Sequence, residues 1–445
     1  MATTNQEKYL FSTQALPKVA WAKGVYLYDT EGKQYFDASG GPAVFAIGHG
    51  NEEVNAAVTR QMAQFAHGYR YNFTSDPLEQ LQEMIGRLCG GGLRHMLFVG
   101  SGSEAMESAL KIALQYQQAI GQTKRTRFIA RQQSYHGNSL GALSVSGYPK
   151  RRAMFAGSLL DVSFVSPANA YRPPEGLSVA EIADFCANEL EQEILRLGAE
   201  TVCAFVFEPI VGAAGGVVPA PPGYAQRMRA VCDRYGVVMI ADEVMCGSGR
   251  SGTWRALGHD GVEPDIMTVA KGLGAGYIPL GAAIYHHKLA EPIFTAHGDL
   301  MTGHTFTGHS TACAAAVAVQ QIVEREGLVA KVAREGEWLQ ATLRAELGDH
   351  PYVGDIRGRG FFIGVEFVAD KGEKRPFSPT HQLAACIRAA TLDAGLICYP
   401  VGGIIDGVHG DAAILAPPYN ITQTEMEELV DRFVTAVRGV LQTVA

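Results

Sequence analysis

The chain has 445 residues, of which 47% are hydrophobic and 18% charged, a composition typical of a globular protein with a large core. The formal net charge of −8 argues against nucleic-acid binding, and no apolar run reaches the roughly 18 residues that a membrane-spanning helix needs. The eight cysteines form no C-x-x-C pair and the first residues lack a signal-peptide core, so we expect a cytoplasmic protein without a metal site.

The N-terminal region predicts a small group of strands. Apolar and polar positions alternate over the first 35 residues or so, as in Trp21-Ala-Lys-Gly-Val-Tyr-Leu-Tyr-Asp, and residues 29–32 supply a hairpin turn. A turn-rich loop, Asp37-Ala-Ser-Gly-Gly-Pro, follows. We assign residues 1–60 to a small domain that the C-terminal part completes.

From there to about residue 285, short apolar runs alternate with helical patterns. The runs are nearly continuous instead of alternating, which is typical of strands buried on both faces; they cover residues 95–99, 127–130, 202–207, 237–241 and 266–270. Helices are expected at 104–116 and 224–235. This order predicts an α/β fold with a mostly parallel sheet, which we place in a large domain at 61–325.

The C-terminal part predicts a second, smaller α/β domain at 326–445. An Ala/Val-rich stretch after Thr311 continues into a charged helix. Residues 357–367, Arg-Gly-Arg-Gly-Phe-Phe-Ile-Gly-Val-Glu-Phe, predict a turn followed by a strand.

Polar residues follow each predicted strand, where ligands bind in parallel α/β sheets. Gly100-Ser-Gly-Ser-Glu-Ala follows residues 95–99 and begins a helix, a place suited to a phosphate, although Ser-x-x-Glu is also an ordinary capping box. Glu208 and Asp242 follow two other runs; such carboxylates often cap helices, but they also hold cationic ring nitrogens protonated.

Lys271-Gly-Leu-Gly-Ala-Gly follows residues 266–270. A lone lysine at a strand end is usually a surface residue, whereas partial burial would lower its pKa and make it nucleophilic, as imine chemistry requires. Tyr135-His-Gly adds an aromatic ring suited to stacking. Together these segments predict a site for pyridoxal 5′-phosphate.

The same motifs carry a family resemblance. From Tyr26-Leu-Tyr-Asp-Thr-Glu-Gly-Lys to Ala416-Pro-Pro-Tyr-Asn-Ile-Thr, the sequence resembles class III aminotransferases, which are fold-type I pyridoxal-phosphate enzymes. The resemblance implies cofactor-binding roles for Ser101, Gly102, Ser103, Tyr135, His136, Glu208, Asp242, Val244 and Thr305, and a Schiff base on Lys271. Thr305 would reach the phosphate of a neighbouring subunit, which implies a homodimer or a dimer of dimers with shared active sites.

Two features bear on the substrate. The residue after Asp242-Glu-Val is Met245, and this segment is similar to that of the amine:pyruvate, or ω-transaminase, branch. Many members of that branch clamp the keto-acid carboxylate with a mobile arginine, and residues 404–411 contain none, so His409, Arg70 or Arg375 is a candidate substitute.

The basic residues 150–152 are interpreted as a solvated turn. The aromatic residues Phe45, Tyr71 and Phe73 are candidates for the pocket rim.

The expected reaction is a ping-pong transfer of an amino group from a small-molecule amine or ω-amino acid to a keto acid, with pyruvate the expected acceptor. A decarboxylase, lyase or aminomutase would use the same cofactor site. A serine hydrolase is a remote alternative, because Gly137-Asn-Ser-Leu-Gly fits a nucleophile elbow at Ser139, with Asp242 and His304 as partners. A non-catalytic relative is disfavoured by the presence of Lys271.

Overall fold

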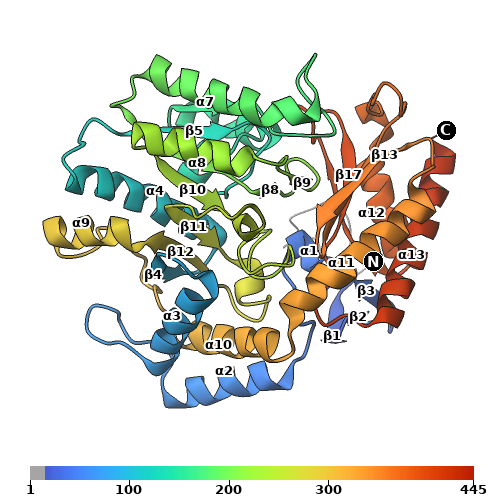
Figure 1. Ribbon diagram of the computed structural model, residues 1–445. Helices are drawn as coiled ribbons and strands as arrows, with labels where there is room; N and C mark the ends of the chain where they lie inside the picture. The colour runs from blue at the N-terminus through green and yellow to red at the C-terminus, as the bar shows by residue number, and fades with distance from the viewer. Residues whose placement is uncertain (1–15, 445) are drawn as a thin grey trace.

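In the computed structural model, which describes residues 16–444, a seven-stranded sheet forms the centre of the larger part of the molecule (Figure 1). The strands pair in parallel, except that β12 runs antiparallel to its neighbours β11 and β4. In spatial order they are β4 (Leu93–Val99), β12 (Gly281–His286), β11 (Ile266–Val269), β10 (Val238–Asp242), β7 (Val202–Phe207), β5 (Arg127–Arg131) and β6 (Val162–Val165). The predicted α/β fold with a mostly parallel sheet is confirmed.

Helices cover both faces of this sheet. On one face, Ala204 and Val206 pack in a cluster with residues of α4 (Gly102–Ala119) and α9 (His287–His297). On the other face, Phe205 packs with residues of α7 (Ile182–Leu197) and α8 (Tyr224–Tyr235). Successive side chains of a strand point to opposite faces, so a strand buried on both sides must be apolar throughout, as the continuous runs are.

Further helices lie at the β4 edge and in the connections. Helix α10 packs against α2 and α3, and α3 packs against β4. These helices are α2 (Glu52–Gln64), α3 (Asp76–Cys89) and α10 (Ser310–Arg325), and the short helices are α1 (Gly40–Ala43), α5 (Leu140–Ser144) and α6 (Pro149–Arg152).

The C-terminal part has its own antiparallel sheet, in the order β13 (Val353–Arg359), β14 (Phe362–Phe367), β17 (Asp411–Leu415), β16 (Tyr399–Gly402). Three helices accompany it: α11 (Leu328–Leu347), α12 (Leu383–Asp393) and α13 (Gln423–Thr443). The predicted turn at the start of 357–367 is wrong in position. Residues 357–359 still belong to β13, and the chain reverses at 360–361, where Gly360 has a φ of 56°.

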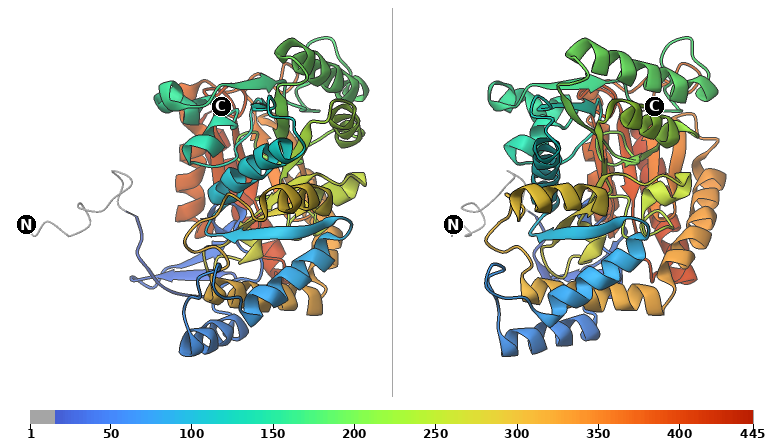
Figure 2. Two further views of the ribbon diagram at one scale, coloured as in Figure 1. Left: turned by 90° about the vertical axis from the view of Figure 1, so that its left-hand side faces the viewer. Right: turned by 60° about the vertical axis from the view of Figure 1, so that its left-hand side comes forward.

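The N-terminal strands lie beside the C-terminal elements (Figure 2). Strands β1 (Val19–Lys23), β2 (Tyr26–Asp29) and β3 (Gln34–Asp37) form two hairpins, and β3 pairs in parallel with β15 (Leu396–Ile397). The predicted turn at residues 29–32 is present. The first fifteen residues of the segment predicted at 1–60 lie outside the described residues.

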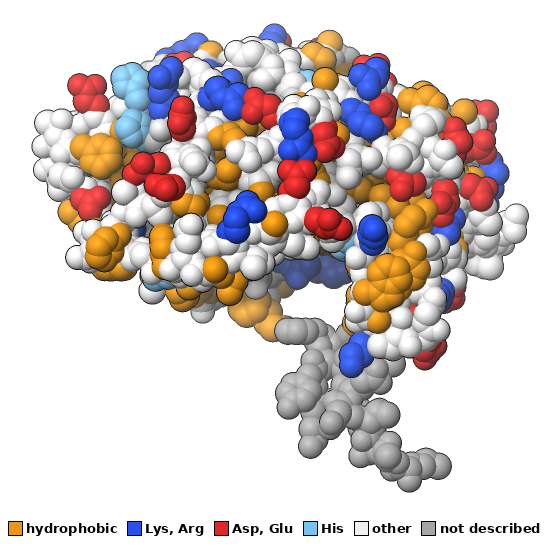
Figure 3. All heavy atoms as spheres, turned by 90° about the horizontal axis from the view of Figure 1, so that it is seen from below, with side chains coloured by type: hydrophobic (Ala, Val, Ile, Leu, Met, Phe, Trp, Pro, Cys, Tyr) orange, Lys and Arg blue, Asp and Glu red, His pale blue; other side chains and the backbone are white. Residues whose placement is uncertain are grey.

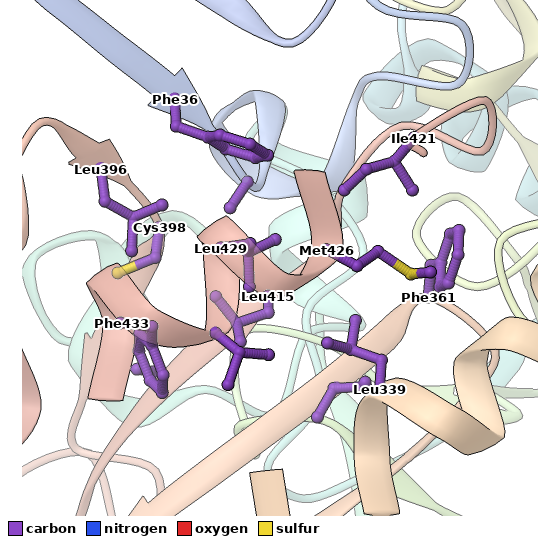
Figure 4. Packing of buried hydrophobic residues seen from close by; sticks show 14 of the residues in the cluster. Phe36, Leu339, Phe361, Leu396, Cys398, Leu415, Ile421, Met426, Leu429 and Phe433 are labelled. Carbon is purple, nitrogen blue, oxygen red and sulfur yellow. The ribbon is translucent and has the colours of Figure 1, made fainter. Parts of the chain in front are cut away.

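A shared core joins these two regions. Phe36 of β3 is fully buried and belongs to one cluster with Leu396, Leu429 and Phe433 (Figure 4). Leu429 and Phe433 come from α13, so the last long helix of the described chain packs on one of its first strands.

Seven of the eight cysteines are buried, and Cys386 on α12 is exposed. On the face seen in Figure 3, acidic and basic side chains are interspersed, with apolar side chains between them. No helix within residues 16–444 is long and apolar enough to cross a membrane.

Candidate active site

A cavity of about 650 Å³ lies where several strands of the large sheet end. This volume is within the range of small-molecule sites. Its lining includes Gly102, Ser103, Tyr135, His136, Glu208, Asp242, Val244 and Lys271, which the sequence singles out, together with Pro42, Tyr148, Lys150, Arg151, Met245, Arg388 and Tyr399. The separate strand-end motifs therefore surround one space, as parallel strands dictate.

A buried pair of side chains, His136 and Asp242, lies at the inner end of the cavity. His136 Nδ1 lies 2.7 Å from Asp242 Oδ2, and both side chains are almost completely buried. Asp242 Oδ1 accepts a hydrogen bond from Val244 N at 3.0 Å. Each carboxylate oxygen has a second lone pair, so Asp242 retains acceptor capacity toward a ligand.

Lys271 follows β11 at the start of a short 3-10 turn, with a φ of 44°. A left-handed conformation is costly for a lysine, and such strain is typical of functional sites. The side chain is partly buried and lines the cavity, and Nζ makes no hydrogen bond or ion pair with another residue of the described chain. Burial lowers the pKa of Lys271, although the nearby negative charges of Asp242 and Glu208 oppose this.

Glu208 holds two loops in place at the inner end. Its Oε1 accepts from Tyr135 N at 2.9 Å and its Oε2 from Gly212 N at 2.8 Å. The carboxyl group is buried, and burial raises its pKa. Gly212 belongs to the loop between β8 (Ile210–Val211) and β9 (Val218–Pro219), so Glu208 shapes the cavity wall through two backbone segments.

The start of α4 combines capping with an open approach to the cavity. Ser101 is the N-cap residue, and its Oγ accepts from Glu104 N at 3.2 Å, so the capping role considered from the sequence is real. Gly102 and Ser103 line the cavity. A Cβ on Gly102 would lie 3.0 Å from Val244 Cγ1, which explains why a residue without a side chain begins this helix.

Ser101, the N-cap residue of α4, is not part of the cavity lining, and four further predicted site residues lie elsewhere. Thr305 is exposed and does not line the cavity. Tyr71 and Phe73 are exposed and line a second cavity of about 250 Å³ together with Arg70. Phe45 packs edge-on against His49 and is also absent from the lining.

The three candidate substitutes for the missing arginine do not line the cavity either. His409 Nδ1 lies 2.7 Å from Asp406 Oδ2, and both side chains are about half exposed. Arg70 is stacked on Tyr71. Arg375 lies on the surface among acidic side chains.

Three cations that the sequence did not point to line the cavity instead. They are Lys150 and Arg151 of α6 and Arg388 of α12, and all three are exposed, so we name them the cationic mouth. The interpretation of residues 150–152 as a solvated turn holds for the exposure of Lys150 and Arg151, but these residues belong to α6 and Arg152 is partly buried. Arg152 donates to the backbone oxygens of three residues between 143 and 146, and it lies over the Phe164 ring.

The structure does not support a hydrolytic triad at Ser139. Its Oγ has no hydrogen-bond partner among the described residues, and Asp242 is paired with His136 and not with His304. Within residues 16–444 no group of three or more His, Cys, Asp or Glu side chains is placed to hold a metal ion.

Solved structures that resemble this chain include ω-transaminases. The (S)-enantioselective ω-transaminase of Thermomicrobium roseum superposes with a TM-score of 0.90 at 35% identity, covering 96% of this chain and 93% of that one. The ω-transaminase of Pseudomonas jessenii in complex with PMP gives a TM-score of 0.91 at 30% identity, with 98% and 97% covered. The fold is that of the fold-type I transaminases.

Sequence comparison defines the family. The class III aminotransferase family matches residues 12–437. The uncharacterized aminotransferase YodT of Bacillus subtilis is 40% identical over 431 residues, which cover 96% of each chain. The chain belongs to the class III aminotransferases, as its motifs indicate.

Proposed function

We propose that this aminotransferase uses pyridoxal 5′-phosphate, held covalently by Lys271, to move an amino group from an amine or ω-amino acid to a keto acid such as pyruvate. The observation that carries the proposal is the meeting of Lys271, the Asp242–His136 pair and the start of α4 around one cavity. The two substrates would bind in turn at this cavity.

The residues present fit such a cofactor. Gly102 and Ser103 line the cavity at the first turn of an 18-residue helix, where free backbone N–H groups and the helix dipole favour a phosphate. Asp242 has acceptor capacity left for a pyridine nitrogen, and Tyr135 and Val244 offer surfaces for a ring. The buried Nε2 of His136 has no partner within residues 16–444 and is also available for a contact.

When bound, pyridoxal phosphate supplies the aldehyde that takes up the amino group and the ring that stabilises negative charge on the substrate carbon. Asp242 would hold a proton on the ring nitrogen, and its bond to His136 fixes its orientation. Lys271 would move the proton of the substrate carbon, which its lowered pKa favours because a neutral amine can accept it. Glu208 would keep Tyr135 and the 212 loop in position.

The test is a visible absorption spectrum of the purified protein before and after addition of an amine donor, either 1-phenylethylamine or 5-aminopentanoate. We expect a violet-region band that bleaches with the donor and returns with pyruvate, with one amino acid formed per keto acid consumed. Lys271→Ala should lose both the band and the transfer, because it removes the amine that holds the cofactor.

Lys124→Ala, at an exposed position, is the matched control and should retain both. A band that bleaches while carbon dioxide appears and no amino acid forms would favour decarboxylation on the same scaffold. A protein that shows no band after incubation with pyridoxal phosphate would overturn the proposal.

A further inference from the structure

We propose that Arg151 is a specificity-determining residue, whose guanidinium binds the carboxylate of the substrate at the cationic mouth. This inference rests on the proposed function, and it assigns a role to one residue of the same cavity.

The ionisable side chains of the cavity differ between its inner end and its mouth. Its inner end holds the buried carboxylates Glu208 and Asp242, whereas Lys150, Arg151 and Arg388 are exposed at the cationic mouth. A substrate that reaches Lys271 with its amine therefore has its other end among cations. Such a wall favours an anionic end and disfavours an apolar one.

The side chain of Arg151 is free to bind a ligand. It makes no hydrogen bond or ion pair with any other residue of the part of the chain that the structure describes, unlike its neighbour Arg152, which is held by backbone oxygens. Its charge acts on the cavity: burial raises the pKa of Tyr135 and of Tyr148, and the positive charge of Arg151 opposes that rise in both.

The backbone of Arg151 is fixed relative to the cavity wall. Arg151 N donates to Tyr148 O at 3.0 Å, and Tyr148 Oη donates to Gly402 O at 2.9 Å. The loop that follows Gly402 packs closely on α6, since a Cβ on Gly407 would lie 3.0 Å from Lys150 N. This is the loop that contains no arginine, so the cation is supplied from α6 instead.

Arg151 is a better candidate than its two neighbours in the mouth. The positive charge of Lys150 lowers the pKa of Asp411, and that of Arg388 lowers the pKa of Cys398, in each case against the effect of burial. Neither Asp411 nor Cys398 lines the cavity. A guanidinium also matches a carboxylate with two parallel hydrogen bonds, which an ammonium does not.

The decisive experiment measures binding without turnover. The holoenzyme is titrated calorimetrically with pentanoate, which has neither an amine nor a keto group, and with uncharged pentanamide. We expect Arg151→Gln to weaken pentanoate binding by about 10- to 100-fold, the range of a charged hydrogen-bonded contact, and to leave pentanamide binding unchanged. Arg151→Lys should give an intermediate loss.

Kinetics give a second readout. In Arg151→Gln, kcat/KM should fall by a similar factor for 5-aminopentanoate and stay within about twofold for pentylamine. Arg375→Gln, an exposed arginine outside the cavity, is the matched control and should change neither. The thermal midpoint of Arg151→Gln should equal that of the native protein, since the side chain has no structural partner in residues 16–444.

Equal pentanoate binding by Arg151→Gln and the native protein would overturn the inference. So would a loss confined to Arg388→Gln. Loss of pentanoate binding in a protein that transfers no amino group would support the anion site and count against the proposed function, so the two failures are distinguishable.

Discussion

Burial shifts the pKa values of ionisable side chains at the inner end of the cavity in opposite directions. Burial raises the pKa of Glu208 and lowers the pKa of Lys271, so both shift toward their neutral forms. Asp242 has a close partner, because His136 Nδ1 lies 2.7 Å from its Oδ2. An amine and a carboxyl group that are easily neutral suit proton transfer, whereas a paired carboxylate suits the support of a cationic ring.

Glu243, next to Asp242, gives a pH-dependent prediction. It is buried, accepts from Leu257 N at 3.0 Å, and burial raises its pKa to about 7. A raised carboxyl pKa means that the folded protein binds more protons than the unfolded chain between about pH 4.5 and 7, so stability falls as the pH rises through that window. The loss is on the order of 3 kcal/mol at most.

We therefore expect Glu243→Gln to flatten the dependence of the thermal midpoint on pH between 5 and 8, because the variant has no proton to lose. Glu200→Gln, at an exposed position, should keep the native profile. Parallel profiles for the native protein and Glu243→Gln would show that Glu243 does not titrate in this range.

The sequence predicted the residues at the inner end of the cavity, but it did not predict those of the cationic mouth. Asp242, Glu208 and Lys271 each follow a buried strand, and parallel strands bring their ends together whatever the details of packing. Arg151 and Arg388 come from short or distant helices, and only tertiary packing brings them to the cavity. A basic run in a sequence carries no sign of what it faces.

Among the elements, β12 lies directly against the start of α4. A Cβ on Gly281, its first residue, would lie 2.6 Å from Ser101 O, so the strand and the start of the helix are in backbone contact. Gly281→Ala should displace the start of α4. We expect a lower thermal midpoint, from a cost of about 1–3 kcal/mol, together with weaker retention of the cofactor.

The measurements are the thermal midpoint and the absorbance that remains after dialysis. Gly157→Ala is the control, since nothing lies within 4 Å of a Cβ there, and it should match the native protein. Native cofactor retention in Gly281→Ala would mean that the start of α4 tolerates the displacement.

The strands that the sequence predicted are those whose residues are large, branched and buried on both faces: β4, β5, β7, β10 and β11. Strand β12 was missed because it begins Gly281-Ala-Ala, and small residues have little strand preference. Strand β6 was missed because it is a half-buried strand of four residues at the edge of the sheet. Its pattern is too short to stand out.

In the whole molecule, the two ends of the chain are folded together. We propose that residues 16–60 and 326–444 form one small domain, on the basis of the β3–β15 pairing and the shared core around Phe36. The sequence contains both halves of this arrangement, but pairing between strands some 360 residues apart leaves no local pattern.

Phe36→Ala tests this arrangement. The side chain is fully buried against residues of α13, so its removal should destabilise the protein by about 3–5 kcal/mol and lower the thermal midpoint. Val19→Ala, on the neighbouring hairpin but 55% exposed, should change the midpoint little. If both variants have the same thermal midpoint as the native protein, the N-terminal strands do not contribute to the stability of the C-terminal part.

The distribution of thiols has a practical consequence for attaching this enzyme to a surface. Cys386 is exposed on α12, while burial raises the pKa of Cys89, Cys203 and Cys398 and keeps these thiols protonated and poorly reactive. A maleimide would therefore couple at one position of the described chain, two residues from Arg388. Immobilised preparations would be uniformly oriented without any engineered cysteine, and a dye at the same point would report on the helix that borders the substrate opening.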